Sequence, residues 1–279
     1  MDSWSRRSPP RHQSTLFDFG GIAAIEIAGL FGMIAFVATS LAVGIRILLL
    51  AARTRLFPET TVGLSLFLAG GVGTALVIAP LFLEDPEPQT PYFLYQFGTA
   101  ICHVGYGLLF VFVWRVFRRE EKWALVLYAA CTAGLFVGAV GMALELQPEA
   151  AMLGNFTSNS VWFWISLGAR FVGYVWASAE SFRYYGMLKK RLEFGLADAA
   201  VASRFLYWGV SLSAVVVIWI NTAVQQLMSG SEDVRWASLL ITAVLGLLVA
   251  ISLWFAFFPR RPKAVASGGV SDAAEGVAQ

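Results

Sequence analysis

The chain has 279 residues, of which 58% are hydrophobic and 14% are charged, and its mean hydropathy is +0.68. Soluble domains are nearer half apolar and a quarter charged, so this composition excludes an ordinary soluble domain and indicates a lipid bilayer as the main surroundings. The formal net charge of +2 gives no indication of nucleic-acid binding.

The chain begins with a polar segment, residues 1–19, that contains Arg6, Arg7 and Arg11. The apolar run after it is too long for the h-region of a signal peptide and lacks an A-x-A cleavage site, so we expect a short tail and a retained first helix. At the other end, residues 260–279 are mostly small or polar and include no aromatic residue, which predicts a disordered tail.

Between the two tails, residues 20–259 contain seven long apolar windows separated by short charged segments. A helix needs about 20 apolar residues to cross a bilayer, and each window reaches that length. Because backbone groups in hydrocarbon must find partners within their own segment, each window is predicted to be a helix. The predicted fold class is therefore an all-α, polytopic membrane protein with seven transmembrane helices. Their approximate ranges are 21–50, 61–83, 92–117, 123–144, 161–187, 205–228 and 234–258.

The connections between the windows contain residues that start and end helices. Pro58 suits the first position of the second helix, and Glu59 is favourable in its first turn. Gly195 suits the end of the fifth helix, and Asp198 suits the N-cap of the sixth. The fifth helix is therefore expected to extend past the membrane, and the sixth to begin before it enters.

The distribution of Lys and Arg predicts the orientation. Most of these residues fall on one side of the predicted spans, and the positive-inside rule assigns that side to the cytoplasm. The C-terminus is then cytoplasmic, and residues 1–19 form an extracytoplasmic tail whose arginines run against the rule. The cytoplasmic set is Arg46, Arg53, Arg55, Arg115, Arg118, Arg119, Lys122, Arg183, Lys189, Lys190, Arg191, Arg204, Arg260, Arg261 and Lys263; the outer set is Arg6, Arg7, Arg11 and Arg235.

Several kinds of chemistry lack the residues that they need. The last window has no lysine for a retinal Schiff base, and His12 and His103 are too few for a bis-histidine haem in the membrane or a zinc site. Cys102 and Cys131 form no CxxC pair, so we expect buried thiols. No window contains an Asp, and no HExxH or GxSxG motif occurs. The sequence predicts no enzyme, no catalytic residue, no metal and no cofactor.

Polar side chains at membrane depth usually face the interior of a helix bundle. At 1.5 Å per residue, Glu26 and Asn221 are expected about 10 Å below the outer boundary, and His103 and Arg170 about 15 Å below it. Arg170 keeps its charge and therefore needs a partner, for which Glu26 is the only carboxylate at that depth. The candidate ligand-binding residues are Glu26, Gln96, Thr99, His103, Arg170, Asn221 and Gln225.

Three interpretations of this polar set remain open. The residues can line an outward-open pocket for a small ligand, they can hydrogen-bond neighbouring helices together, or they can form part of a solute path. Two other features have structural interpretations. Gly134 and Gly138 form a GxxxG pair that favours close helix contact within the monomer over dimerisation. Glu180, near the inner interface and close to Arg183, is expected either to form an ion pair with it or to extend its carboxylate to the interface.

Two basic segments, GIRILLLAARTRLFPE at 44–59 and KKRLEFGLADAAVASRFLYW at 189–208, resemble stretches of uncharacterised bacterial seven-helix membrane proteins. The resemblance implies a bacterial origin and an inner-membrane location, and it implies no activity.

These features favour a non-enzymatic, receptor-like sensor. A small ligand would bind the outer pocket, and Lys189, Lys190 and Arg191 would relay the change to a cytoplasmic protein partner or contact anionic lipid. The alternatives are a small-solute transporter or permease subunit, and a structural or assembly partner of another membrane complex. The scarcity of polar residues in the inner half of the spans favours the sensor over the transporter.

Overall fold

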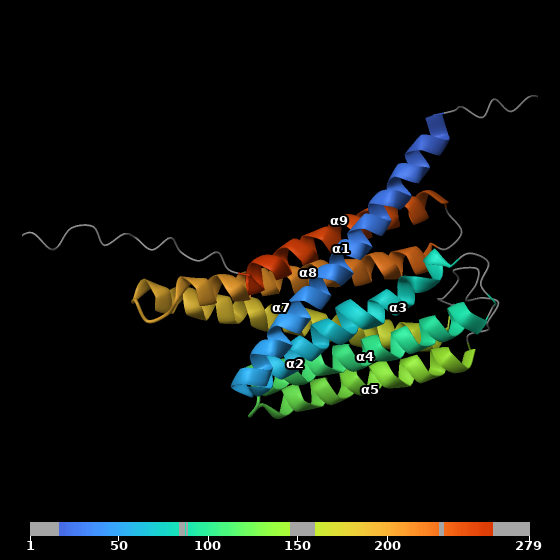
Figure 1. The fold of residues 1–279 in the computed structure, drawn as a ribbon. Coiled ribbons are helices and arrows are strands. Elements are labelled where there is room, and N and C mark those ends of the chain that lie inside the picture. Colours follow the sequence, from blue (N-terminus) through green and yellow to red (C-terminus); the bar gives the residue numbers. More distant parts are fainter. Residues whose placement is uncertain (1–16, 84–86, 88, 146–159, 229–231, 259–279) are drawn as a thin grey trace, which may run out of the picture.

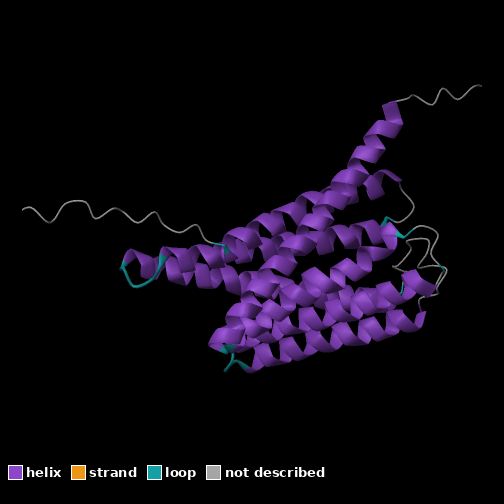
Figure 2. Cartoon of the chain, viewed as in Figure 1, coloured by secondary structure: helices purple, strands orange, loops and turns teal. Residues whose placement is uncertain are grey.

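The computed structural model describes residues 17–83, 87, 89–145, 160–228 and 232–258, without the side chains of 17–26 and 232–236. Within these ranges the chain is a bundle of helices with no strand (Figures 1 and 2). The elements are α1 (Phe17–Thr54), α2 (Phe57–Ser65), η1 (Leu66–Gly73), α3 (Thr74–Ile78), η2 (Ala79–Phe82), α4 (Gln89–Phe117), α5 (Lys122–Glu145), α7 (Val161–Glu193), α8 (Ala199–Leu227) and α9 (Glu232–Phe257).

The helices agree with an all-α polytopic membrane protein. Six stretches are long and apolar enough to cross a membrane, and they correspond to α1, the continuous helix from α2 to η2, α4, α5, α8 and α9. α7 has 33 residues but is less apolar, because it contains Arg170, Glu180 and many Trp, Tyr and Ser residues. α1 begins at Phe17, inside the predicted tail of residues 1–19. The predicted tail of residues 260–279 lies outside the described residues.

The helices close into a ring. Going round it, α1 packs on α9, α9 on α8, α8 on α7, α7 on α5, and α5 on α4, which packs on the second span. The second span, α2 with η1, returns to α1 and completes the ring. α4 also contacts α7 directly, so α5 lies outside the α4–α7 seam. Residues far apart in sequence therefore face one common centre.

The second span is not the uninterrupted α-helix that its apolar run predicted. It changes from α2 to a π-helix at Leu66–Gly73, returns to α-helix in α3, and ends in the 3-10 turn η2. Within the π-helix, the carbonyl oxygen of Ala69 accepts two hydrogen bonds from side chains. The donors are Thr74 Oγ1 at 2.7 Å and Cys102 Sγ at 3.4 Å.

The turn between α7 and α8 has the predicted caps. Gly195 has a φ of +68°, the left-handed conformation that glycine adopts without strain. Its amide donates to the Leu192 carbonyl and the amide of Leu196 donates to the Arg191 carbonyl, which is the Schellman pattern. Asp198 caps α8 by accepting from the Ala200 amide at 2.8 Å. The hairpin formed by α7 and α8 extends beyond the other helix ends (Figure 1).

Small residues of α5 pack within the chain, as predicted. A Cβ added to Gly138 would lie 2.6 Å from the Ser166 Cβ and 2.8 Å from the Ser166 amide nitrogen. Gly134 faces Ala169 in the same way, with 3.0 Å between the added Cβ and the alanine Cβ. The GxxxG pair of α5 is therefore the contact surface for α7, and it lets the two backbones approach closely.

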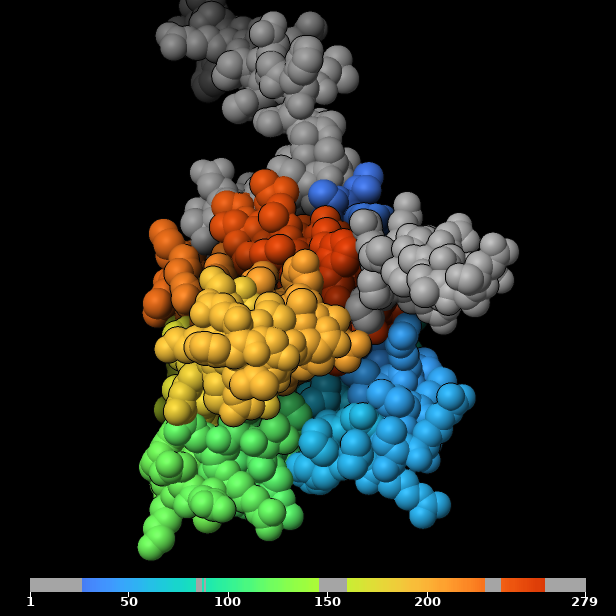
Figure 3. Space-filling view, turned by 90° about the vertical axis from the view of Figure 1, so that its left-hand side faces the viewer, coloured from blue at the N-terminus to red at the C-terminus, as the bar shows by residue number. Residues whose placement is uncertain are grey.

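The basic residues gather at one end of the bundle, which we call the basic end. It is formed by the α1–α2, α4–α5 and α7–α8 connections, and Figure 3 shows it facing the viewer. Every described Lys or Arg side chain other than Arg170 lies on helix segments that lead to these three connections. Over the part of the chain that the structure describes, the Lys and Arg residues are therefore asymmetric along the bundle axis, which is the pattern of the positive-inside rule.

Candidate functional site

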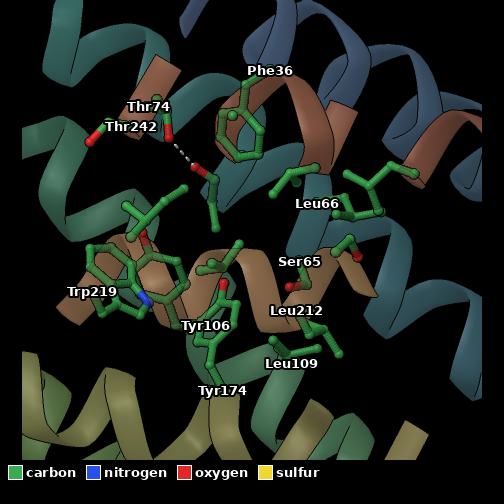
Figure 4. Close-up of a pocket in the computed structure, with 18 of the residues that line it drawn as sticks. Phe36, Ser65, Leu66, Thr74, Tyr106, Leu109, Tyr174, Leu212, Trp219 and Thr242 are labelled. Atoms are coloured by element: carbon green, nitrogen blue, oxygen red, sulfur yellow. Dashed lines mark hydrogen bonds between the residues drawn. The ribbon is translucent and has the colours of Figure 1, made fainter. Parts of the chain in front are cut away.

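A cavity of about 290 Å³ lies at the centre of the ring. Every member of the ring except α5 contributes to its wall, and the wall is mostly apolar. Figure 4 shows Phe36 and Leu66 on one side and Trp219 on the other, with Tyr106 and Tyr174 below. The residues with polar side-chain groups in the lining are few: Ser65, Thr74, Tyr106, Tyr174, Trp208, Ser211, Trp219 and Thr242. A mostly apolar wall with a few hydrogen-bonding groups is typical of small-molecule sites.

Three aromatic side chains from three helices form one wall of the cavity. Tyr106 of α4, Tyr174 of α7 and Trp219 of α8 meet edge to face, with ring centres 5.8 Å apart for the two tyrosines. The Trp219 ring centre lies 6.1 Å from Tyr106 and 6.3 Å from Tyr174. Such edge-to-face contacts fix ring positions, because the positive edge of one ring meets the negative face of the next. We call Tyr106, Tyr174 and Trp219 the aromatic wall.

The π-helical segment forms much of the opposite side. Ser65, Leu66, Ala69, Gly70 and Thr74 all line the cavity, so the irregular part of the second span is the part that faces it. π-helical turns are rare and occur often at functional sites. The coincidence of the π turn and the cavity supports a functional role for the cavity.

Arg170 lies one helical turn from Tyr174 on α7. Its guanidinium carbon is 4.6 Å from the centre of the Trp219 ring, and its Nε donates to the Ser166 carbonyl at 3.2 Å. Among the described side chains, no carboxylate lies within 4 Å of the guanidinium. The predicted partner Glu26 belongs to α1, but its side chain lies outside the described residues, so the Glu26–Arg170 ion pair stays a prediction.

His103 joins α4 to α7 and does not line the cavity. Its Nδ1 is 2.6 Å from the Thr99 carbonyl oxygen, and its Nε2 is 2.9 Å from Ser166 Oγ. A carbonyl oxygen only accepts, so Nδ1 must carry the hydrogen, and in the neutral ring Nε2 accepts from the serine hydroxyl. The side chain is 1% exposed. This geometry corresponds to hydrogen bonding between helices.

Asn221 and Gln225 join α8 to α9. The Asn221 amide nitrogen donates to the Ser238 carbonyl at 3.0 Å, to Ser238 Oγ at 2.8 Å and to Thr242 Oγ1 at 3.0 Å. Ser238 Oγ in turn donates to Gln225 Oε1 at 3.0 Å. Thr242 also lines the cavity, so this network reaches the cavity through one hydroxyl.

The six predicted site residues with described side chains fall into separate groups. Arg170 contacts the aromatic wall, His103 and the Thr99 carbonyl belong to the α4–α7 seam, and Asn221 and Gln225 belong to the α8–α9 seam. Gln96 has a buried amide nitrogen without a hydrogen-bond partner among the described residues. None of the six lines the cavity.

The predicted site omits the cavity residues, because that prediction rested on charged, amide, hydroxyl and imidazole groups, whereas the cavity wall is mostly apolar. The signal that could have revealed them is the position of the aromatic residues. Aromatic side chains of membrane helices concentrate at the two interfaces. Tyr106 and Tyr174, in contrast, fall well inside their spans. Tyrosine at that depth must place its hydroxyl inside the bundle, and it therefore indicates an internal polar surface.

At the basic end, Glu180 is buried with 7% exposure and pairs with two cations. Its closer partner is Arg118, the residue directly after α4, with 2.6 Å between Nε and Oε1. Arg183, the partner expected from the sequence, lies 3.6 Å from the other carboxylate oxygen. The pair to Arg118 connects α4 to α7 across the ring, which sequence spacing did not indicate.

The tip of the α7–α8 hairpin combines charge with exposed apolar side chains. Lys189, Lys190 and Arg191 are all exposed. Phe194 and Leu196, on either side of Gly195, are each 77% exposed. A basic and apolar tip of this kind is suited to contact another surface.

Within the described residues, no group of three or more His, Cys, Asp or Glu side chains could hold a metal ion. Cys102 and Cys131 are free and buried, as expected from their positions in apolar windows. No family model, no curated protein and no solved structure matches this chain.

Proposed function

We propose that this chain is a seven-span protein of a bacterial inner membrane that acts as a ligand sensor and has no catalytic activity of its own. α7 completes the count of seven spans, because its 33 residues are about 50 Å long and exceed the ~30 Å hydrocarbon core. The positive-inside rule assigns the basic end to the cytoplasm, so the N-terminus is outside and the C-terminus inside.

One observation carries this proposal: two of the three helices that form the aromatic wall also form the projecting hairpin. Tyr174 of α7 and Trp219 of α8 line the cavity, and the same two helices meet at Gly195. A ligand that shifts Tyr174 against Trp219 would move α7 against α8, and rigid helices would carry the movement to the tip. The tip would then present Lys189, Lys190 and Arg191 differently to an acidic protein partner.

The test fills the cavity by mutation and measures the position of the hairpin tip. Val215 lines the cavity, whereas Val217 on the same helix is 44% exposed on the outside of the bundle. Val215→Phe fills the cavity and Val217→Phe is the matched control. Spin labels at Leu196 and Arg119, in a background where Cys102 and Cys131 are Ala, report the distance from the tip to the α4–α5 turn.

We expect Val215→Phe to change the distribution of label distances in nanodiscs and Val217→Phe to leave it unchanged. The joint substitution of Lys189, Lys190 and Arg191 by Gln should leave the fold intact and reduce co-purification of a cytoplasmic partner. If the two Val variants give the same label distances, the cavity and the tip are not coupled and the sensor proposal fails. If the label distances change as expected but the Gln substitutions do not reduce co-purification of a partner, the three basic residues contact anionic lipid instead.

A transporter is the second candidate, and the π-helical turn beside the cavity favours it. Transporters bind their solutes near mid-membrane at interrupted helices. The measurement that separates the two is solute flux into proteoliposomes. Flux that Val215→Phe abolishes and Val217→Phe preserves would replace the sensor by the transporter.

A further inference from the structure

The contact between α1 and the second span is confined to part of that span. α1 packs against α2 and η1, but over the described residues it makes no comparable contact with α3. α1 and α3 point in different directions (Figure 1). Met33 and Phe36 line the cavity on the α1 side of this divergence, and Gly70 and Thr74 line it on the other. The cavity lining therefore includes residues on both sides of this divergence.

The cavity extends along the bundle axis. Its lining on α8 runs from Trp208 to Trp219, and its lining on α9 runs from Thr242 to Leu253. At 1.5 Å per residue, either stretch is about 16 Å long along the bundle axis. The volume of about 290 Å³ falls at the low end of the ~300–1,000 Å³ typical of small-molecule sites. This length and volume suit one extended apolar chain.

A cation stands beside one end of this space. Arg170 does not line the cavity itself; it lies one turn from Tyr174, on the side away from the basic end, with its guanidinium carbon over the Trp219 ring. Its Nε is used by the Ser166 carbonyl, while its two terminal amino groups have no acceptor among the described residues. The Trp219 Nε1 is also buried without an acceptor in the same set. A guanidinium stacked on a ring keeps its edge available for a carboxylate.

We infer that the cavity binds a single-chain lipophilic acid taken from the bilayer, with its chain between Trp219 and Trp208 and its carboxylate at the Arg170 guanidinium. The inference rests on the proposed function, since it names the ligand class of the same cavity. The other occupant of the guanidinium edge is Glu26 of this chain, and the test includes it.

The probes are dodecanoate and 1-dodecanol, which share a chain length and differ in the charged head. Binding of radiolabelled dodecanoate, and its displacement by 1-dodecanol, is measured on the full chain in nanodiscs of zwitterionic lipid. We expect dodecanoate to bind at least about tenfold more tightly than the alcohol, because hydrogen bonds to charged groups are stronger than neutral ones. Arg170→Gln should bring dodecanoate to the affinity of dodecanol and leave dodecanol unchanged. Arg183→Gln, at an exposed arginine, is the control and should change neither.

Val215→Phe should abolish saturable binding of both probes, and Val217→Phe should preserve it. Equal affinities for acid and alcohol, or an Arg170→Gln variant that still prefers the acid, would overturn the assignment of an acid and leave the cavity as a ligand site. Dodecanoate binding that appears only in Glu26→Gln would show that Glu26 occupies Arg170 in the native protein, which also overturns it. Failure of both probes, with an unchanged response of the hairpin labels to Val215→Phe, would reject the lipophilic acid and not the sensor.

Discussion

The guanidinium carbon of Arg170 lies 4.6 Å from the centre of the Trp219 ring, so a cation of α7 rests on an aromatic face of α8. The electron-rich ring face attracts the charge, by about 2 kcal/mol where water is excluded. Together with the Ser166 carbonyl, this contact explains part of how a permanent charge is held among apolar helices. It also links the cavity wall to the α7–α8 pair that forms the hairpin.

The first prediction concerns this contact. A double-mutant cycle with Arg170→Gln and Trp219→Leu should give a coupling free energy of about 1–2 kcal/mol in thermal unfolding in detergent. Trp219→Phe should retain much of the coupling, because it keeps a ring face. Arg183→Gln combined with Trp219→Leu should be additive, since Arg183 pairs with Glu180 at the basic end. Additivity of the Arg170 cycle would mean that the ring does not stabilise the cation.

The second prediction concerns Glu26. If Glu26 neutralises Arg170, Arg170→Leu should be tolerated better than Glu26→Leu, because a carboxylate can take up a proton whereas the guanidinium cannot lose one. The double change should then recover stability relative to Glu26→Leu alone. Thermal unfolding of the two single variants and the double variant decides the question. Independent effects would leave Trp219 and Ser166 as the partners of Arg170.

The third prediction concerns the contact of α5 with α7. Gly138→Ala should destabilise the protein by about 1–3 kcal/mol, because the added Cβ would overlap the Ser166 backbone and force the helices apart. The shift should also lengthen the Ser166–His103 hydrogen bond. Gly168→Ala is the matched control on α7, where an added Cβ meets nothing within 4 Å, and it should be neutral or stabilising by about 1 kcal/mol. A Gly138→Ala variant as stable as the control would contradict the packing described.

The fourth prediction concerns the two arginines that face Glu180. The Arg118 side chain is 20% exposed and the Arg183 side chain is 64% exposed. Arg118→Gln should therefore destabilise the protein by about 1–3 kcal/mol, since it leaves a buried carboxylate without its nearer cation. Arg183→Gln should change stability by less than about 1 kcal/mol, as exposed pairs usually do. Equal effects in thermal unfolding would mean that the ion pair with Arg118 stabilises the protein no more than the ion pair with Arg183.

The fifth prediction concerns orientation. A reporter that works only in the cytoplasm should be active when it is fused to the C-terminus. An N-terminal tag should react with reagents added outside the cell. A single cysteine at Phe194 should label only after the membrane is opened. The opposite pattern for the three sites would reverse the orientation and with it the direction of the proposed signal.

The sequence determined which segments are helices and where several of them end. Apolar windows of about 20 residues leave the backbone no alternative to helix, so the long helices were predictable from composition alone. The turn between α7 and α8 was equally local, because the positive φ of Gly195 and the cap formed by Asp198 depend on a few neighbouring residues. The concentration of Lys and Arg at one end also follows directly from the order of residues along the chain.

Tertiary structure decided which side chains meet. Lipid and protein interior are both apolar, so hydropathy does not specify how a membrane helix is rotated about its axis or which helix lies beside it. For that reason the sequence placed His103 and Asn221 in one site, whereas the ring of helices directs His103 to Ser166 and Asn221 to Ser238. The same ring brings Tyr106, Tyr174 and Trp219 together from three helices. A cavity lined by residues so far apart in sequence exists only once the rotations and the order of the helices are fixed.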